Sequence, residues 1–289
     1  MSPLPPAAFT TVLDAVVDAQ QRKSIDTRYT AGLSIPSFIL IFIAAAIGSG
    51  VNSVAGGGTL VTFPAIVWLG LSPLVANATS TVALWPGAVG SMWAYRGELT
   101  GARRWLTWFT IPSLAGGAFG AWLLLHTPAH RFDDIVPFLV LGATVLFVVQ
   151  RPLATWLAPG RSEFGAEGQP LPRPAAWVLA AQFAVGVYGG YFGAGIGILM
   201  LATLGAMGLT GIHRMNGLKN WGAMCMNGIA AVAFAASGLV VWPVAIAMTA
   251  GALAGGYVGA RLALRAGQVW VRRAVILTGL IAFIWLLAR

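Results

Sequence analysis

Long apolar runs separated by short polar turns fill almost the whole chain from residue 34 onward. This pattern predicts ten helical segments, at about residues 35–55, 59–71, 76–95, 104–125, 134–150, 174–193, 196–209, 215–236, 240–264 and 270–288. A helix needs about 20 residues to cross a bilayer, and the second and seventh segments have only about 13. Whether these two short segments span a membrane or re-enter from one side stays open.

A polar, proline-rich stretch at residues 151–173 divides the ten segments into five and five. We therefore expect an N-terminal tail (1–33), a first repeat (34–150), an inter-repeat loop (151–173) and a second repeat (174–289). The tail lacks the basic start and long apolar run of a signal peptide. Its FTTVLDAVVDA stretch fits a short amphipathic helix on a membrane surface, and a disordered tail fits it equally well.

The two sets of five segments resemble each other at a constant offset of 139 residues, the spacing from Gly50 to Gly189. LAGGAFGA at 114–121 aligns with LAGGYVGA at 253–260. Other pairs at this offset are Gly56 with Gly195, Gly58 with Gly197, and Asn77 with Asn216. Several matches at one offset indicate an internal repeat. Because five is odd, the second copy starts from the opposite face if all segments cross. We therefore predict an all-α polytopic membrane protein of two five-segment inverted repeats.

Composition supports a membrane location. Of the 289 residues, 58% are hydrophobic and 9% are charged, and the mean hydropathy is +0.80, whereas soluble proteins carry roughly 25% charged residues. The net charge of +9 comes from basic residues scattered between apolar runs, which is typical of membrane-protein loops and not of a nucleic-acid-binding surface. The single cysteine, Cys225, excludes a disulfide within the chain.

The basic residues also predict an orientation. With ten crossings, the loops on one side hold 12 lysines and arginines and those on the other side hold 5. The positive-inside rule makes the richer side cytoplasmic, which leaves both termini outside. Omitting Lys219, which lies inside a segment, changes the count only to 11 against 5. Re-entrant short segments would change the parity of the later loops.

Glycine clusters precede both short segments, at Gly56, Gly57 and Gly58 and at Gly193, Gly195 and Gly197. Backbone leaves a helix at membrane depth only inside protein or beside a wet cavity, and paired interrupted segments are typical of a transporter's binding site. We expect short half-helices at the centre, whose N-termini attract an anion. The alternative is that the glycines only allow close packing, as we expect for the GxxxG steps of Gly251, Gly255 and Gly259.

A polar cluster opens the helix that follows each short segment. Asn216, Lys219 and Asn220 have the spacing of one helix face, and Asn77, Ser80 and Thr81 repeat it. Two alternatives are that each asparagine caps its helix and that Lys219 snorkels to the surface, since an unpaired lysine in lipid costs roughly 2.5–3.5 kcal/mol. The predicted substrate-binding set is Asn52, Ser53, Gly56, Gly57, Gly58, Asn77, Thr79, Ser80, Gly193, Gly195, Gly197, Asn216, Lys219 and Asn220.

No acidic residue is expected inside the membrane, because all eight Asp and Glu residues fall in the tail or at segment ends. Cation channels and proton relays use such carboxylates, so the centre suits an anion better. A hydrolase would need a base beside Ser49 or Ser53, and no histidine or carboxylate lies mid-span. We expect no enzyme activity, cofactor, metal site or nucleic-acid partner. The expected partners are a small anionic substrate and the lipid bilayer. A passive anion channel is the alternative to a carrier.

Residues 50–99 and 186–238 resemble the two halves of the TauE/SafE sulfite exporter family, also called the TSUP family. The resemblance rests on the glycine break, the Asn-Ala-Thr-Ser and Leu-Lys-Asn stretches, and the Gly-Gly-x-x-Gly-Ala motif, and it covers the chain from about residue 35. It implies a multi-pass permease of the bacterial inner membrane. By this resemblance the protein would export small sulfur anions, such as sulfite, sulfoacetate or related organosulfonates, by alternating access.

Overall fold

Helices make up nearly all of the described chain. The computed structural model describes residues 26–27, 29–30, 32–157, 173–209, 211–263 and 269–288, and no strand forms within these ranges. Its elements are α2 (Ile35–Ala55), α3 (Thr59–Trp68), α4 (Pro73–Ala94), the 3-10 helix η1 (Arg96–Leu99), α5 (Arg103–Leu125), α6 (Ala129–Leu157), α7 (Ala176–Tyr191), α8 (Ile196–Ala206), α9 (Ile212–Ala236), α10 (Trp242–Ala263) and α11 (Val269–Leu287). The predicted all-helical class is confirmed. The FTTVLDAVVDA stretch of the tail lies outside the described residues.

Each of the ten expected segments corresponds to one helix. The largest difference is α6, expected at 134–150, which runs from Ala129 to Leu157. Its polar first turn is part of the helix, with the Phe132 N–H donating to the Pro128 carbonyl, and its end enters the stretch assigned to the loop. Similarly, α4 begins at Pro73 because a proline in the first turn has the helical φ and needs no hydrogen-bond acceptor.

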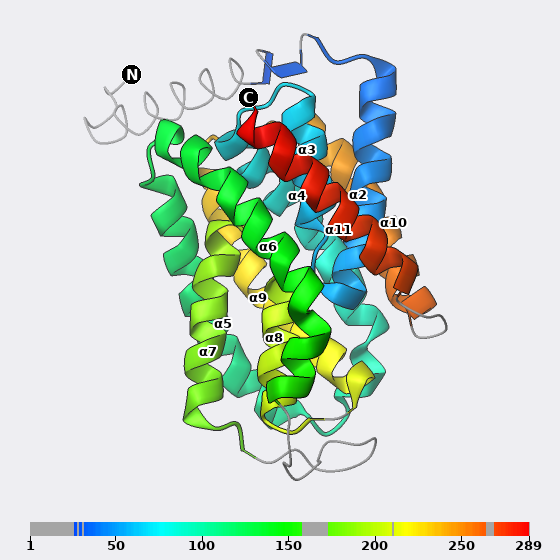
Figure 1. Cartoon of the computed structure of the whole chain (residues 1–289), viewed down its shortest axis with the longest axis vertical. Helices are drawn as coiled ribbons and strands as arrows, with labels where there is room; N and C mark the ends of the chain where they lie inside the picture. Colours follow the sequence, from blue (N-terminus) through cyan, green and yellow to red (C-terminus); the bar gives the residue numbers. More distant parts are fainter. Residues whose placement is uncertain are drawn as a thin grey trace, which may run out of the picture.

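The two short helices run toward opposite ends of the molecule (Figure 1). The chain leaves one end through α2 and returns to it through α3, since the Tyr29 hydroxyl before α2 donates to Ser72 just before α4. At the other end the chain enters through α7 and returns through α8, and Arg214 at the start of α9 donates to the Thr100 carbonyl. The longer helices α4, α5, α6, α9, α10 and α11 connect the two ends.

The first five helices are interleaved with the last five. α2 packs along α10, and α5 packs along α7. Small residues permit this contact, because a Cβ on Gly255 of α10 would overlap the Ala46 carbonyl of α2. In the same way, a Cβ on Gly116 of α5, the residue 139 positions earlier, would overlap the Phe183 carbonyl of α7. The packing role predicted for the GxxxG glycines is confirmed, since Gly251, Gly255 and Gly259 all meet the α2 backbone.

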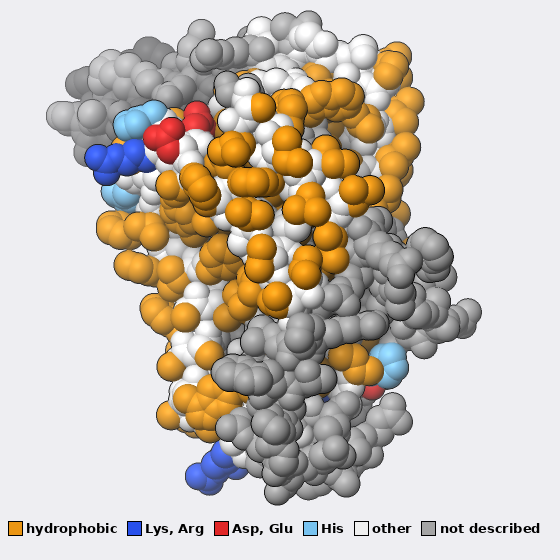
Figure 2. Space-filling model, viewed as in Figure 1, with side chains coloured by type: hydrophobic (Ala, Val, Ile, Leu, Met, Phe, Trp, Pro, Cys, Tyr) orange, Lys and Arg blue, Asp and Glu red, His pale blue; other side chains and the backbone are white. Residues whose placement is uncertain are grey.

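The lateral surface is apolar, and the visible charged side chains gather toward the two ends (Figure 2). Large hydrophobic side chains such as Ile111 and Val232 are about two-thirds exposed (67% and 66%), which favours a lipid environment. By length and composition, three stretches of the described helices can cross a membrane: Ile35–Ser53, Arg103–Leu125 and Ala129–Val149.

Candidate functional site

The two glycine breaks lie against each other although they are far apart in sequence. A Cβ added to Gly56 would overlap the backbone of Gly197, and the reverse substitution would overlap Gly56. Gly56 ends α2 in the left-handed conformation (φ 77°), and Gly195 precedes α8 in the same conformation (φ 79°). The N-termini of α3 and α8 are therefore brought together between the two ends of the molecule (Figure 1).

The glycines at these breaks also fill tightly packed positions. A Cβ on Gly57 would overlap the ring of Phe147 from α6, and a Cβ on Gly58 would overlap the Gly48 carbonyl of α2. The close-packing alternative is thus correct as a description of these contacts. It does not oppose a binding role, because the same packing holds the two helix N-termini beside each other.

Lys219 is buried at this junction, with 1% of its surface exposed. Its Nζ donates to the carbonyl oxygens of Asn52 (3.0 Å) and Ser53 (2.9 Å) at the carboxyl end of α2. Asn220 adds a longer bond to the Ser53 carbonyl (3.3 Å). The carboxyl end of a helix carries partial negative charge, so it stabilises the ammonium. The snorkelling alternative for Lys219 is wrong, because the side chain is buried and does not reach the surface.

The stem of Lys219 passes the start of α8 on its way to α2. A Cβ on Gly197 would lie 3.0 Å from the Lys219 Cδ. The described contacts use two of the three N–H groups of the ammonium. One formal positive charge therefore lies between the carboxyl end of α2 and the amino end of α8.

Asn77 makes the corresponding contact in the other half. Its Nδ2 donates to the Tyr191 carbonyl at the carboxyl end of α7 (2.9 Å). The Oδ1 atoms of Asn77 and of Asn216, its equivalent at the 139-residue offset, are both buried without a hydrogen-bond partner. The capping alternative is wrong for both asparagines, because α4 begins after Ser72 and α9 begins after Gly211.

The remaining predicted polar residues tie helices together. Thr79 accepts a hydrogen bond from the Val241 N–H that precedes α10 (3.1 Å), and Ser80 bonds to Thr62 of α3 (2.9 Å). The predicted polar side chains that the structure buries below a tenth of their surface are Ser53, Asn77, Thr79, Ser80, Asn216, Lys219 and Asn220. Asn52 is partly buried and contributes its carbonyl to Lys219.

Two features of this centre escaped the sequence-based prediction. Thr62 lies in an apolar run, and only its position one turn after the glycine break signals a role. The second feature is that backbone carbonyls of α2 and α7 accept from the predicted side-chain donors. A helix break exposes carbonyls before it as well as N–H groups after it, so the break itself was the available signal.

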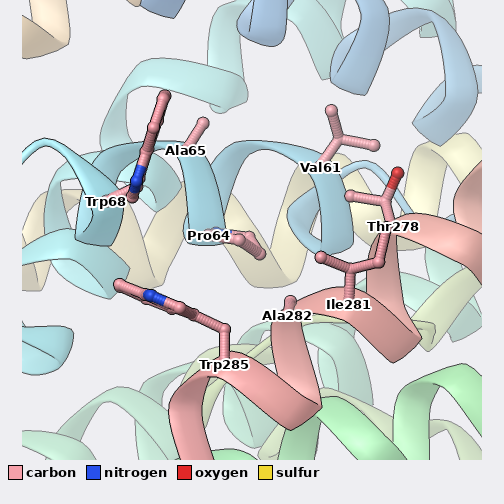
Figure 3. Close-up of a pocket in the computed structure, with 8 residues that line it drawn as sticks. All are labelled: Val61, Pro64, Ala65, Trp68, Thr278, Ile281, Ala282 and Trp285. Carbon is pink, nitrogen blue, oxygen red and sulfur yellow. The ribbon is translucent and has the colours of Figure 1, made fainter. Parts of the chain in front are cut away.

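Two cavities lie away from the breaks. One of about 320 Å³ lies between α3 and α11 and has apolar walls, including Val61, Pro64, Trp68 and Trp285 (Figure 3). Apart from its two tryptophans, Thr278 is the one lining residue of this cavity with a polar side chain. The cavity therefore does not suit an anion. The other, of about 470 Å³, is lined by Ser72, Asp133 and Asp134 at the end where α4 begins.

Comparison with known proteins identifies the family. A family model described as sulfite exporter TauE/SafE matches residues 40–286. The chain belongs to the TauE/SafE sulfite exporter family. It is 26% identical over 251 residues to a probable membrane transporter protein of Haemophilus influenzae, covering 85% of this chain and 92% of the relative.

Two further relatives carry similar names. The probable membrane transporter protein ORF9 of a Sinorhizobium species is 27% identical over 253 residues, covering 86% of this chain and 91% of that protein. The probable membrane transporter protein YfcA of Escherichia coli K12 is 26% identical over 246 residues, covering 82% and 85%. The sequence-based resemblance is confirmed: this TauE/SafE member is a membrane transporter, a class that does not normally include enzymes.

Proposed function

We propose that this TauE/SafE member is a permease of the bacterial inner membrane that exports small sulfur-containing anions, namely sulfite, sulfoacetate or related organosulfonates, by alternating access. The family description supports the substrate class. A passive anion channel is the competing function, because a channel also needs a polar path through the membrane.

The observation that carries the proposal is the contact between the two breaks. It brings together the N-termini of α3 and α8, whose first N–H groups have no acceptor within the helix. Such ends attract anions, and Lys219 adds a formal charge beside the start of α8. In this proposal Asn77, Thr79, Ser80, Asn216 and Asn220 add polar contacts to the substrate when the packed breaks separate.

An inverted repeat is part of the proposal. α2 starts at one end of the molecule and α7 starts at the other (Figure 1). Contacts recur at the same offset: α10 packs on α2 and α4, as α5 packs on α7 and α9. Related halves of opposite direction are typical of carriers that expose one central site alternately to the two sides.

The interleaved packing changes which parts we expect to move. One unit would combine α2, α4 and α10, and the other would combine α5, α7 and α9, because these sets share the most extensive contacts. Each unit therefore contains helices from both halves of the sequence. The central site lies between them, where α4 meets α9.

The decisive experiment is counterflow with purified protein in liposomes. We expect uptake of labelled sulfite or sulfoacetate to accelerate when unlabelled substrate is present inside, as in a carrier. An open channel shows no such acceleration, and absence of any anion flux would reject the proposal.

Lys219→Ala is expected to abolish this anion flux because it removes the positive charge beside the start of α8. It also removes two hydrogen bonds to α2 carbonyls, whose remaining donors are the Gly56 N–H and the Asn220 amide, so we expect a loss of about 1–3 kcal/mol in stability in a protein that remains extractable and monodisperse. Gln182→Leu is the control, since it removes a buried hydrogen bond to Ser113 (2.8 Å) without changing charge. Unchanged flux in Lys219→Ala would exclude its role.

A further inference from the structure

The carboxyl ends of α2 and α7 occupy equivalent places in the two repeats but accept hydrogen bonds from different side chains. At α2, the ammonium of Lys219 and the amide of Asn220 donate to the last carbonyls. The residues equivalent to these two at the 139-residue offset are Ser80 and Thr81. Ser80 bonds to Thr62, and Thr81 donates to the Asn77 carbonyl of its own helix. The end of α7 therefore receives no positive side chain at the position where α2 receives one.

Asn77 leaves an oxygen atom without a donor beside this end of α7. The side chain is 1% exposed, and its Oδ1 has no hydrogen-bond partner. Flipping the amide would place Oδ1 against the Tyr191 carbonyl, which its Nδ2 now contacts at 2.9 Å, so the orientation is fixed. The result is a buried amide oxygen without a donor, next to the Tyr191 carbonyl at the negative end of a helix. Asn216 Oδ1 is likewise without a partner, but its end of the site already holds the Lys219 ammonium. At α7 the buried acceptor has neither a donor nor a cationic side chain among the described residues.

A cavity with acidic lining residues lies at the start of α4, the helix that carries Asn77. Asp133 and Asp134 line it together with Ser72 and Pro73, and Asn77 lies one helical turn farther along α4, about 6 Å away along the axis. Phe132, next to Asp133, packs its ring against Tyr191 and Phe192 (centroid distances 5.8 and 6.4 Å). The exposed carboxylate of Asp134 favours cations at this end of the molecule.

We propose that Asn77 and the carboxyl end of α7 bind a monovalent cation, Na⁺, as the counterpart of the Lys219 ammonium at α2. Carbonyl and amide oxygens without a carboxylate suit a monovalent ion, whereas Ca²⁺ and Mg²⁺ sites use carboxylates. Carbonyls of interrupted helices coordinate Na⁺ in other carriers. This inference rests on the proposed function. In an anion exporter this Na⁺ would be the coupling ion, and its inward movement would drive the outward movement of the anion.

Binding is tested on the full-length purified protein without any anionic substrate. NaCl is exchanged for choline chloride at constant ionic strength while thermal stability is recorded. We expect a saturable rise in Tm of about 3 °C or more that choline does not produce. An equal rise in Tm in choline chloride overturns the proposal. If lowering the pH without Na⁺ produces the same rise in Tm, the proposal is also overturned, and the bound cation is a proton.

Matched variants locate the ion. Asn77→Ala is expected to lose the Na⁺ response, whereas Asn216→Ala, the equivalent change in the half that contains Lys219, is expected to keep it. Ser80→Lys should also abolish the response by supplying a fixed ammonium at the position equivalent to Lys219. Na⁺ stabilisation that persists in Asn77→Ala and Ser80→Lys overturns the proposal.

A direct measurement covers the case in which a variant fails to fold. Equilibrium binding of ²²Na⁺ to the wild-type protein should show saturable binding of about one ion, displaced by unlabelled Na⁺ and not by choline. Absence of specific binding overturns the proposal. Because these assays contain no sulfur anion, they can fail while counterflow succeeds, and the reverse also holds.

Discussion

Lys219 places its amino group inside the molecule, and two backbone carbonyls accept hydrogen bonds from it where a carboxylate partner is more usual. The break after α2 leaves the Ser53 carbonyl without a helical donor, and Lys219 donates to it and to the Asn52 carbonyl, which also accepts from the Gly56 N–H. One break therefore supplies both the partners of the charge and, through α3, the N–H groups of the proposed anion site. Asn77 shows the same relation to α7 with a neutral side chain.

Alanine variants of Gly56 and Gly57, in the first break, should differ in whether a second substitution can recover their stability. The nearest atoms that a Cβ on Gly57 would meet all belong to the Phe147 ring, so Phe147→Leu should recover part of the stability that Gly57→Ala loses. Gly56→Ala also adopts φ 77° and meets the Gly197 backbone, so we expect a loss of about 2 kcal/mol or more that Phe147→Leu does not relieve. Thermal unfolding of the single and double variants measures this difference.

If Phe147→Leu rescues both variants equally, the distinction between a side-chain clash and a backbone clash is wrong.

The sequence predicted that these glycines and the polar residues near them are buried together. It did not reveal the direction of the hydrogen bonds, because the prediction considered the N–H groups after each break and not the carbonyls before it. Thr62, the partner of Ser80, was missed because it lies in an apolar run.

Among the helices, α2 and α10 show how small residues replace the hydrophobic effect in lipid. Apolar side chains gain little by leaving a hydrocarbon solvent, so close backbone contact supplies the association. Gly255 lies where a methyl group would overlap the Ala46 carbonyl. Gly142 of α6 has no atom within contact distance and is exposed.

Gly255→Ala should therefore lower the Tm of the purified protein, because overpacking of this kind costs about 1–3 kcal/mol. Gly142→Ala is the matched control and should leave Tm unchanged or raise it slightly, since alanine favours a helix by up to about 1 kcal/mol over glycine. Equal effects of the two substitutions would show that helix propensity, not the contact with α2, decides the outcome.

Helix positions were predictable from the apolar runs, and the short α3 and α8 were recognised by their length. The partners of the helices were not, because every face of a lipid-embedded helix is apolar and periodicity no longer distinguishes the buried side. The GxxxG steps indicated a close contact for α10 without naming α2 as its partner. The true start of α6 was missed because its first turn is polar, as in HRFDD at residues 130–134.

For the whole molecule, the way α3 folds back along α2, and α8 along α7, answers the question of which end each later loop lies at. Each short helix returns to the end from which its preceding helix started. Because each pair of helices starts and finishes at one end of the molecule, every later loop lies at the same end as it would with ten full crossings. The excess of basic residues therefore still predicts a cytoplasmic side holding Arg96 and an outer side holding Arg131.

Cysteine labelling in intact cells tests this orientation. In a Cys225→Ser background, Arg131→Cys should react with a membrane-impermeant maleimide, because this exposed position follows α5 on the outer side. Arg96→Cys, equally exposed, should react only after the cells are permeabilised. Labelling of Arg96→Cys and not Arg131→Cys in intact cells would invert the orientation.

The pairing of α2 with α10 has a consequence for biosynthesis. α2 enters the membrane early, but the glycines that cover its backbone arrive only after residues 56–241 have been made. At about 5–20 residues per second, this leaves the face of α2 without its final neighbour for roughly 10–40 s. The nascent protein must therefore hold its earliest helix in lipid, or against a temporary neighbour, until nearly the last part of the chain has left the ribosome.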